Sequence, residues 1–247
     1  MGLFSTKNKP TSDELPGPLN RPSQPIGLFQ NYIDHEKPVV VAIHENQYSW
    51  GNEDSRYQIM VAASGSIAIK PHFSWKTTVP KEIRDPHNNP LFNFKMKTWS
   101  STHTFQAFSP AGGDNPIFTV KNTTRYVSTK IALSYVNTMD GRPVEITLED
   151  SKEKRSAIKE HEGVFKLTSD PAQPILGYIT PNPPTIIQES AASKAVGDKK
   201  RMGSYYLTIA PGVDGALLMT LCLCLDEIKM DKELAKAAGD GGSIAIG

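Results

Sequence analysis

The sequence predicts an all-β fold, a closed antiparallel barrel of ten to twelve strands that encloses one hydrophobic C-terminal α-helix. Two observations lead to this prediction. Many short strand-like runs are separated by tight-turn sequences, and one helical stretch near the C-terminus is apolar on every side. No regular helix pattern separates the strands, so parallel strand–helix–strand units are disfavoured.

The first 38 residues contain six prolines and no sustained periodicity. We interpret residues 1–38 as a flexible proline-rich N-terminal arm. The barrel domain is expected over residues 39–230, and a flexible tail over residues 231–247.

The strand-like runs begin directly after the arm and are rich in β-branched and aromatic residues. Ten are clear and two, Ser66–Ile69 and Thr185–Gln188, are weaker. The ten are Val39–His44, Tyr57–Ala63, Leu91–Lys95, Thr104–Phe108, Ile117–Lys121, Ile131–Tyr135, Val144–Leu148, Val164–Leu167, Ile175–Ile179 and Tyr205–Ile209.

Turn chemistry separates several of these runs, at Ala63-Ser64-Gly65, Asp85–Pro90, Gly112–Asn115 and Asp140-Gly141. Such sequences are typical of hairpins between antiparallel strands. Many antiparallel strands must close or stack to remove their edges, and an apolar helix offers a core around which they can close.

The helix is predicted over Val213–Ile228, after the turn Pro211-Gly212. From Gly215 to Leu225 its only polar residue is Thr220. These 11 residues span about 16 Å, whereas a bilayer core is about 30 Å thick. The helix is therefore expected inside a protein domain, with Asp214 in its first turn opposing the helix dipole. Asp226 and Glu227 are expected to leave the barrel and to pair with groups such as Lys229.

Composition narrows the function classes. The 247 residues carry a net charge of +1, so nucleic-acid or membrane binding would depend on a local patch rather than on overall charge. The only cysteines, Cys222 and Cys224, lie in the apolar helix on different faces and are interpreted as buried thiols. With no visible signal peptide, a cytoplasmic location is expected.

No catalytic motif is present, and no histidine lies at a metal-ligand spacing from another. The chain is therefore predicted to be no enzyme, with no catalytic residues, no metal and no cofactor. Without a basic stripe, a nucleic-acid partner is disfavoured.

Three stretches resemble the LURP-one-related family, which shares the tubby-like C-terminal fold with tubby proteins and phospholipid scramblases. They are Ile83–Lys97 (IRDPHNNPLFNFKMK), Thr102–Arg125, and Tyr206–Ile228 (YLTIAPGVDGALLMTLCLCLDEI), which is the most specific. The similarity covers roughly residues 40–230 and implies a twelve-stranded barrel around the C-terminal helix. This chain has Asn88 where the family tends to have glycine, and Phe105 where it tends to have tryptophan.

Tubby-like domains are associated with phosphoinositide binding, so the basic clusters become candidate sites. Lys199, Lys200 and Arg201 form the densest run and are candidates for contact with a lipid headgroup or another anion. A second cluster at residues 152–159 is interleaved with acidic residues, which favours a solvated face.

The N-terminus Met1–Thr6 fits the myristoylation pattern M-G-x-x-x-[ST], with Gly2 as the acylation candidate. One acyl chain binds membranes only marginally, so any attachment is expected to be reversible.

The function expected from these features is a non-enzymatic tubby-like domain, peripheral to the membrane, that binds phosphoinositide or another anionic phospholipid. The alternative is a soluble adaptor or signalling module that binds an unidentified protein partner without lipid specificity. A scramblase-like lipid transporter is disfavoured, since no stretch is long enough to span a membrane.

Overall fold

The computed structural model of the chain describes residues 19–45, 57–72, 81–97, 103–124, 129–150, 162–184 and 204–239. Within these residues twelve strands form one closed barrel in which sequence neighbours are spatial neighbours and β1 pairs with β12. The strands are β1 (Val39–Glu45), β2 (Tyr57–Val61), β3 (Ile67–His72), β4 (Lys81–Arg84), β5 (Pro90–Met96), β6 (Thr104–Phe108), β7 (Phe118–Asn122), β8 (Lys130–Val136), β9 (Pro143–Asp150), β10 (Gly163–Leu167), β11 (Ile175–Thr180) and β12 (Ser204–Ile209).

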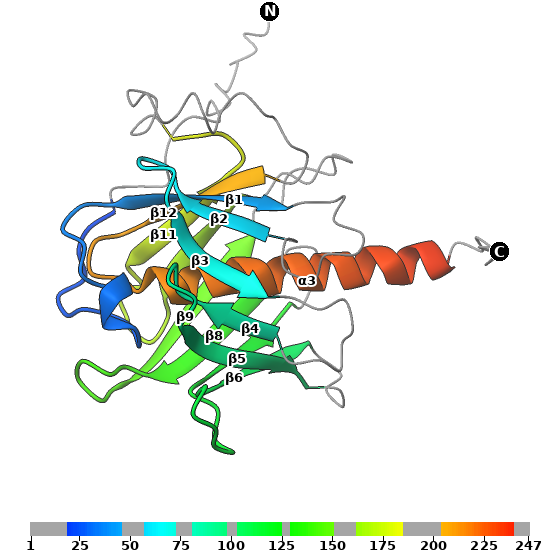
Figure 1. The fold of residues 1–247 in the computed structure, drawn as a ribbon, viewed down its shortest axis with the longest axis horizontal. Helices are drawn as coiled ribbons and strands as arrows, with labels where there is room; N and C mark the ends of the chain where they lie inside the picture. The colour runs from blue at the N-terminus through cyan, green and yellow to red at the C-terminus, as the bar shows by residue number, and fades with distance from the viewer. Residues whose placement is uncertain are drawn as a thin grey trace, which may run out of the picture.

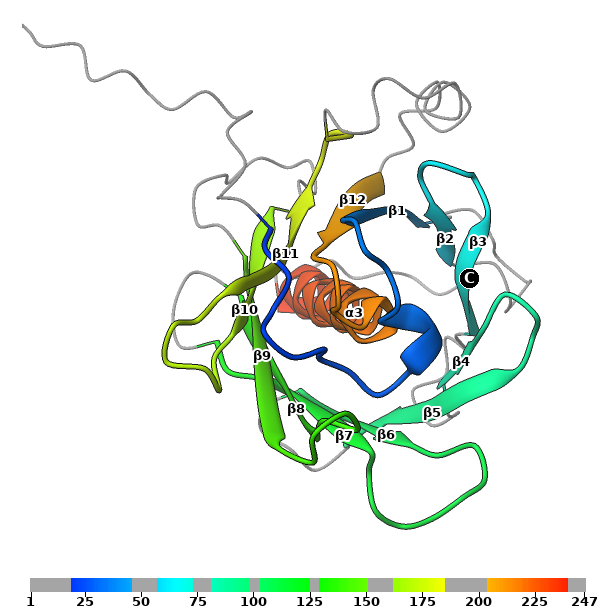
Figure 2. The same ribbon diagram turned by 90° about the vertical axis from the view of Figure 1, so that its left-hand side faces the viewer.

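The barrel encloses α3 (Gly215–Gly239), as Figures 1 and 2 show from two sides. All twelve strand pairs are antiparallel, so successive connections alternate between the two ends of the barrel. The prediction of a closed antiparallel barrel around a hydrophobic helix is therefore confirmed.

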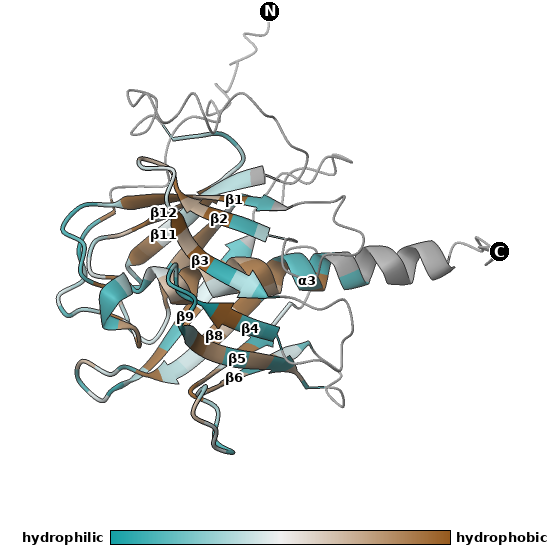
Figure 3. Cartoon of the chain, viewed as in Figure 1, coloured by the Kyte–Doolittle hydropathy of each residue, from teal (hydrophilic) through white to brown (hydrophobic). Residues whose placement is uncertain are grey.

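Alternation along the strands explains why the barrel closes around this helix. In β10, for example, Gly163, Phe165 and Leu167 are buried and the residues between them are partly exposed. Side chains from all twelve strands and from α3 form one continuous core. Figure 3 shows the enclosed part of α3 as largely hydrophobic, with hydrophilic colour appearing where the helix leaves the barrel.

The helix is longer than predicted. It runs from Gly215 to Gly239, rather than from Val213 to Ile228, and so extends into the stretch expected to be a flexible tail. The apolar pattern marks only the enclosed part, and the next described side chains, Lys229 and Asp231, are partly exposed. No helix in the described part of the chain is long and apolar enough to cross a membrane.

One strand, β4, was not predicted from the sequence. β4 has the sequence KEIR, in which three of four residues are charged, and only Ile83 is buried among apolar side chains. The weak candidate Ser66–Ile69 corresponds to β3, whereas Thr185–Gln188 lies outside the described residues.

The β4–β5 turn places a non-glycine residue in a left-handed conformation. Asn88 has a φ of 71°, a left-handed conformation that asparagine tolerates better than most residues. Asp85 holds the turn by accepting the backbone N–H groups of His87 and Asn89, each at 2.8 Å.

We name the two ends of the barrel by what lies there. The strap end is where α3 begins, and it is crossed by residues 19–38, which we call the strap (Figure 2). The exit end is where α3 leaves the barrel, and the connections β1–β2, β3–β4, β5–β6, β7–β8, β9–β10 and β11–β12 begin and end there.

The strap differs from the flexible arm expected over residues 1–38. Ile26 and Ile33 are buried, and Gln30–Tyr32 forms a short 3-10 helix, η1. The prolines that suggested flexibility do not prevent packing, because the strap is extended and finds its hydrogen-bond partners on the barrel. Residues 1–18 lie outside the described residues.

Candidate functional site

The interior of the barrel is packed with side chains. Phe92, Phe94, Phe105 and Phe165 from the strands and Leu217, Leu218, Leu221 and Leu225 from the helix are at most 2% exposed. A binding site is therefore to be sought at the ends or on the outer wall.

Asp214 is the centre of the strap end. It is the residue before α3, and one oxygen of its carboxylate accepts the N–H groups of Ala216 and Leu217 at 2.9 and 3.4 Å. The other oxygen accepts the N–H groups of Leu28 and Phe29 at 2.9 and 2.8 Å. Asp214 thus caps the helix, instead of lying in its first turn as predicted, and holds the strap as well.

Burial controls the acidity of this carboxyl group. Desolvation raises the pKa of Asp214 to about 6, although the four N–H donors act in the opposite direction. The same carboxylate contributes to the raised pKa of Tyr32 and Tyr135, after the larger effect of their own burial. Asp214 is therefore a buried group that titrates near neutral pH.

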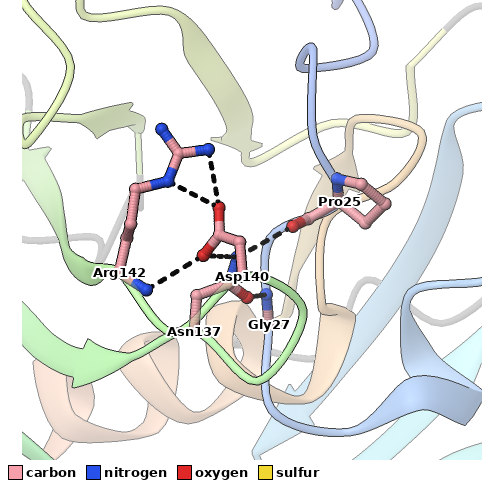
Figure 4. Close-up of polar contacts among 5 residues, drawn as sticks. All are labelled: Pro25, Gly27, Asn137, Asp140 and Arg142. Atoms are coloured by element: carbon pink, nitrogen blue, oxygen red, sulfur yellow. Dashed lines mark hydrogen bonds and ion pairs between the residues drawn. The ribbon is translucent and has the colours of Figure 1, made fainter.

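The β8–β9 turn provides the second anchor of the strap, drawn in Figure 4. The buried amide of Asn137 accepts the N–H of Gly27 at 3.0 Å and donates to the carbonyl oxygen of Pro25 at 3.1 Å. It also donates to Asp140, which forms an ion pair with Arg142. The Arg142 backbone N–H is the main cause of the lowered pKa of Asp140.

The exit end contains buried charged residues. Asp226 accepts the hydroxyl of Tyr205 at 2.8 Å, and Glu227 pairs with Lys81 of β4. The prediction that these two carboxylates leave the barrel is therefore wrong, since they are only 8% and 7% exposed. Their pairing with groups such as Lys229 stays a prediction. Antiparallel closure brings the first residue of β4 next to the helix, and no sequence pattern shows that.

The cysteines fulfil their prediction. Cys222 and Cys224 are free and fully buried, and burial raises the pKa of both thiols well above the usual value. Neither thiol is therefore an activated nucleophile.

A shallow pocket of about 410 Å³ lies on the outer wall, beneath the β6–β7 turn. Lys95 and Asn93 of β5 line one side, and Phe108, Pro110 and Asp114 line the other. The Lys95 ammonium lies 5.6 Å from the centre of the Phe108 ring. The opposite charges of Lys95 and Asp114 give this pocket no net attraction for an anion.

The predicted site residues fall outside the described residues. These are Gly2, the acylation candidate, and Lys199, Lys200 and Arg201, the anion-binding candidates. Residues 181–203 follow β11, which ends at the exit end, and precede β12, which begins there. Among the described residues no group of histidine, cysteine, aspartate and glutamate could hold a metal ion.

Sequence reasoning missed Asn137 and Lys81, because their partners lie 110 and 146 residues away. The repeated tripeptide Gly-Leu-Phe, at residues 2–4 and 27–29, is the one sequence signal that could have drawn attention to the strap.

Comparison with known proteins gives a family and a distant structural likeness. A family model described as LURP-one-related matches residues 39–226. The X-ray structure of a protein from Arabidopsis thaliana is similar over 81% of this chain and 95% of that chain, with 15% identity and a TM-score of 0.48. No curated protein matches the chain.

Proposed function

The chain belongs to the LURP-one-related family, and we propose that its barrel is a non-catalytic domain that binds anionic lipid headgroups at a membrane surface. We place the contact at the exit end, with Lys199, Lys200 and Arg201 as its cationic centre. Acylation of Gly2 is the second part of the proposed attachment.

The observation that carries this proposal is an unequal division of charge between the two ends. The six connections at the exit end contain twelve lysines and arginines against seven aspartates and glutamates. The strand and helix connections at the strap end contain one arginine, Arg142, against five aspartates. In a chain of nearly zero net charge, the connections at the exit end thus carry an excess of positive charge and those at the strap end an excess of negative charge.

The filled interior supports an external contact. Because α3 occupies the space that a lipid tail would need, we expect headgroup recognition rather than extraction of a whole lipid. Each lysine or arginine near an anionic leaflet contributes about 1 kcal/mol, so the three-residue run is sufficient for weak, salt-sensitive binding.

Gly2 would add a hydrophobic anchor to this electrostatic contact. Lys7 and Lys9 follow it in the sequence and carry the same charge as the exit end. A single acyl chain combined with basic residues gives reversible attachment, whereas either signal alone is marginal.

The test is co-sedimentation with vesicles that contain phosphatidylcholine alone or with phosphatidylserine or phosphoinositides. Acylated protein and the Gly2→Ala variant are compared at low and physiological salt. Headgroup-dependent binding that persists in Gly2→Ala supports a lipid site on the barrel. Binding that needs only the acyl chain, or no binding in either form, contradicts such a site and favours a protein-interaction module.

A further inference from the structure

The barrel recognises the strap through its main chain. Between Pro25 and Phe29 the barrel binds seven backbone polar groups. The Ile26 N–H donates to Gly212 and the Ile26 carbonyl accepts the Asp214 N–H, at 2.9 and 2.8 Å. Thr138 donates its hydroxyl and its N–H to the Gly27 carbonyl at 3.0 and 3.2 Å. The remaining four groups bind Asn137 and Asp214, as described above.

This arrangement resembles the way in which domains bind extended peptides, where main-chain hydrogen bonds give affinity and side-chain positions give specificity. Asn137 acts as donor and acceptor on either side of Ile26, and the Asp214 carboxylate accepts two successive N–H groups. The strap end therefore contains a peptide-binding site that is occupied by the chain's own strap.

The site selects glycine at its centre. A Cβ atom on Gly27 would overlap Asp214 Cβ and would lie 2.7 Å from Ile33 Cδ1. The main chain of the strap thus approaches Asp214 too closely for any other residue. This close approach lets the Asp214 carboxylate reach the next two N–H groups.

Side chains on either side of the glycine fill apolar positions. Ile26 is 4% exposed and belongs to the main core. The ring of Phe29 stacks on Phe92 with 5.5 Å between ring centres, and Phe92 meets Phe118 edge to face. The pattern that these contacts describe is therefore a large apolar residue, then glycine, and a phenylalanine two residues after the glycine.

The same pattern occurs once more in this chain, at Met1-Gly2-Leu3-Phe4. Met1 is similar in volume and polarity to Ile26, and the following three residues are identical to Gly27-Leu28-Phe29. We propose that Met1–Phe4 is a second occupant of the strap site and competes with Ile26–Phe29 for Asp214 and Asn137.

Chain connectivity explains why Ile26–Phe29 occupies the site in the wild-type protein. It continues directly into η1 and the buried Ile33, whereas Met1–Phe4 would have to close a loop of the intervening residues. Tethering keeps the effective concentration of Met1–Phe4 high, so the competitor needs only a modest weakening of the seated segment to replace it.

The exchange uses an intact Met1, whereas acylation of Gly2 requires removal of Met1. It is therefore separate from the proposed membrane attachment, and an acylated chain cannot undergo it. The consequence of the exchange is that Gly2 has two alternative environments, one buried beside Asp214 and one away from the barrel.

The first test is a double-mutant cycle on the full chain, with Gly27→Ala to displace the seated segment and Gly2→Ala to disable the competitor. Urea unfolding is expected to respond weakly to Gly2→Ala in the wild type. In the Gly27→Ala background the same change should lower the unfolding midpoint further. An equal effect of Gly2→Ala in both backgrounds would overturn the proposal.

The second test locates Met1–Phe4 directly. A nitroxide on Ser5→Cys is selective because Cys222 and Cys224 are fully buried. In Gly27→Ala it should broaden the backbone amide signals of Asn137 and Thr138, and Gly2→Ala should abolish this broadening. In a mixed sample, one set of chains carries the nitroxide and another set carries only the isotope label. Broadening in this sample means that Met1–Phe4 binds a second copy, whereas broadening only in doubly labelled chains means that it binds its own chain. Unbroadened signals in every sample contradict both forms of the proposal.

A peptide experiment applies if Gly27→Ala does not fold. Acetyl-Met-Gly-Leu-Phe-Ser-Thr-amide is titrated into the isotope-labelled wild-type protein, with the Met-Ala-Leu-Phe peptide as the control. We expect the backbone amide NMR signals of Asp214 and Asn137 to shift with the glycine peptide and not with the alanine peptide. Equal shifts with both peptides, or none, overturn the proposal.

Discussion

The carboxylate of Asp214 accepts the backbone N–H of Phe29 at 2.8 Å, across 185 residues of sequence. The same oxygen accepts Leu28, and the other oxygen caps α3 through Ala216 and Leu217. One buried side chain therefore connects the start of the helix with the strap that covers it. Changes at Asp214 should affect both elements together.

Asp214→Ala removes the acceptor of four N–H groups at a buried position. A lost helix cap costs about 1 kcal/mol and each unsatisfied buried donor costs more, so we expect a loss of about 3 kcal/mol in the free energy of unfolding. Urea denaturation measures this loss, and proteolysis at residues 19–33 should accelerate. Asp170→Ala is the control, because its carboxylate accepts the N–H of Ala172 at 2.8 Å within the exposed β10–β11 turn. A loss no greater than that of the control would contradict the role of Asp214.

Stability should depend on pH through Asp214. Its pKa is raised to about 6 in the folded protein from 3.8, so the folded state binds the proton more tightly. The resulting stabilisation is fully present below pH 3.8 and is lost as the pH rises through about 6, for a total of about 3 kcal/mol. Relative to Asp214→Asn, the wild type should therefore become more stable as the pH falls from 7 to 4.

Comparison with Asp214→Asn isolates this effect from other carboxyl groups. Asp85 and Asp140 have lowered pKa values, so their protonation in acid destabilises the folded state. Both residues are present in the wild type and in Asp214→Asn, so this effect is the same in the two proteins. Parallel stability curves for the two proteins between pH 4 and 7 would show that Asp214 does not titrate there.

The barrel and its helix could be predicted because burial acts on the pattern of the sequence. Strands such as β10 alternate between core and surface, and the all-apolar stretch Gly215–Leu225 has to be enclosed. β4 could not be predicted in this way, since Lys81 faces the helix and Arg84 faces outwards. A charged residue that finds a buried partner has no signature in a local window.

The strap site was unpredictable for a related reason. Asn137, Asp214 and Gly27 are each ordinary turn or capping residues in their own segments, and only the closure of the barrel brings them together. Proline content and the lack of periodicity predicted a flexible arm, whereas the strap packs on the barrel and contains η1. The membrane-related residues Gly2 and Lys199–Arg201 remain sequence-based predictions.

Breaking the ion pair between Lys81 and Glu227 should destabilise the folded protein, whereas replacing both residues by apolar ones should cost little. Lys81→Met removes the Lys81 ammonium from the buried Glu227 carboxylate, which costs about 3 kcal/mol. The double variant Lys81→Met/Glu227→Leu should recover most of this loss. Thermal unfolding of the wild type, Lys81→Met, Glu227→Leu and the double variant completes the cycle. Additive effects of the two single changes would show that the pair is not coupled.

The enclosed position of α3 makes Leu221 intolerant of charge. Its side chain is fully buried, and a carboxylate there would have no partner in an apolar barrel. We expect Leu221→Asp to prevent folding and Leu221→Met to fold with a loss below about 1.5 kcal/mol. Circular dichroism and size-exclusion chromatography report the outcome. A soluble, monomeric and folded Leu221→Asp protein would contradict the enclosed helix.

Lipid binding at the exit end should depend on where positive charge is removed, and not only on how much. Replacing Lys199, Lys200 and Arg201 by glutamine should weaken binding to anionic vesicles more than tenfold, since three contacts of about 1 kcal/mol each are lost. The salt dependence of the remaining binding should also become shallower, because fewer ionic contacts remain to be screened.

The matched control for this triple variant changes Lys37, Lys95 and Lys166 to glutamine. These three lysines lie outside the exit-end connections, so the net charge falls by the same amount while the exit end keeps its lysines and arginines. The control should bind almost as well as the wild type. Equal losses in the two variants would mean that vesicle binding responds to total charge, and the exit end would then have no special part in it.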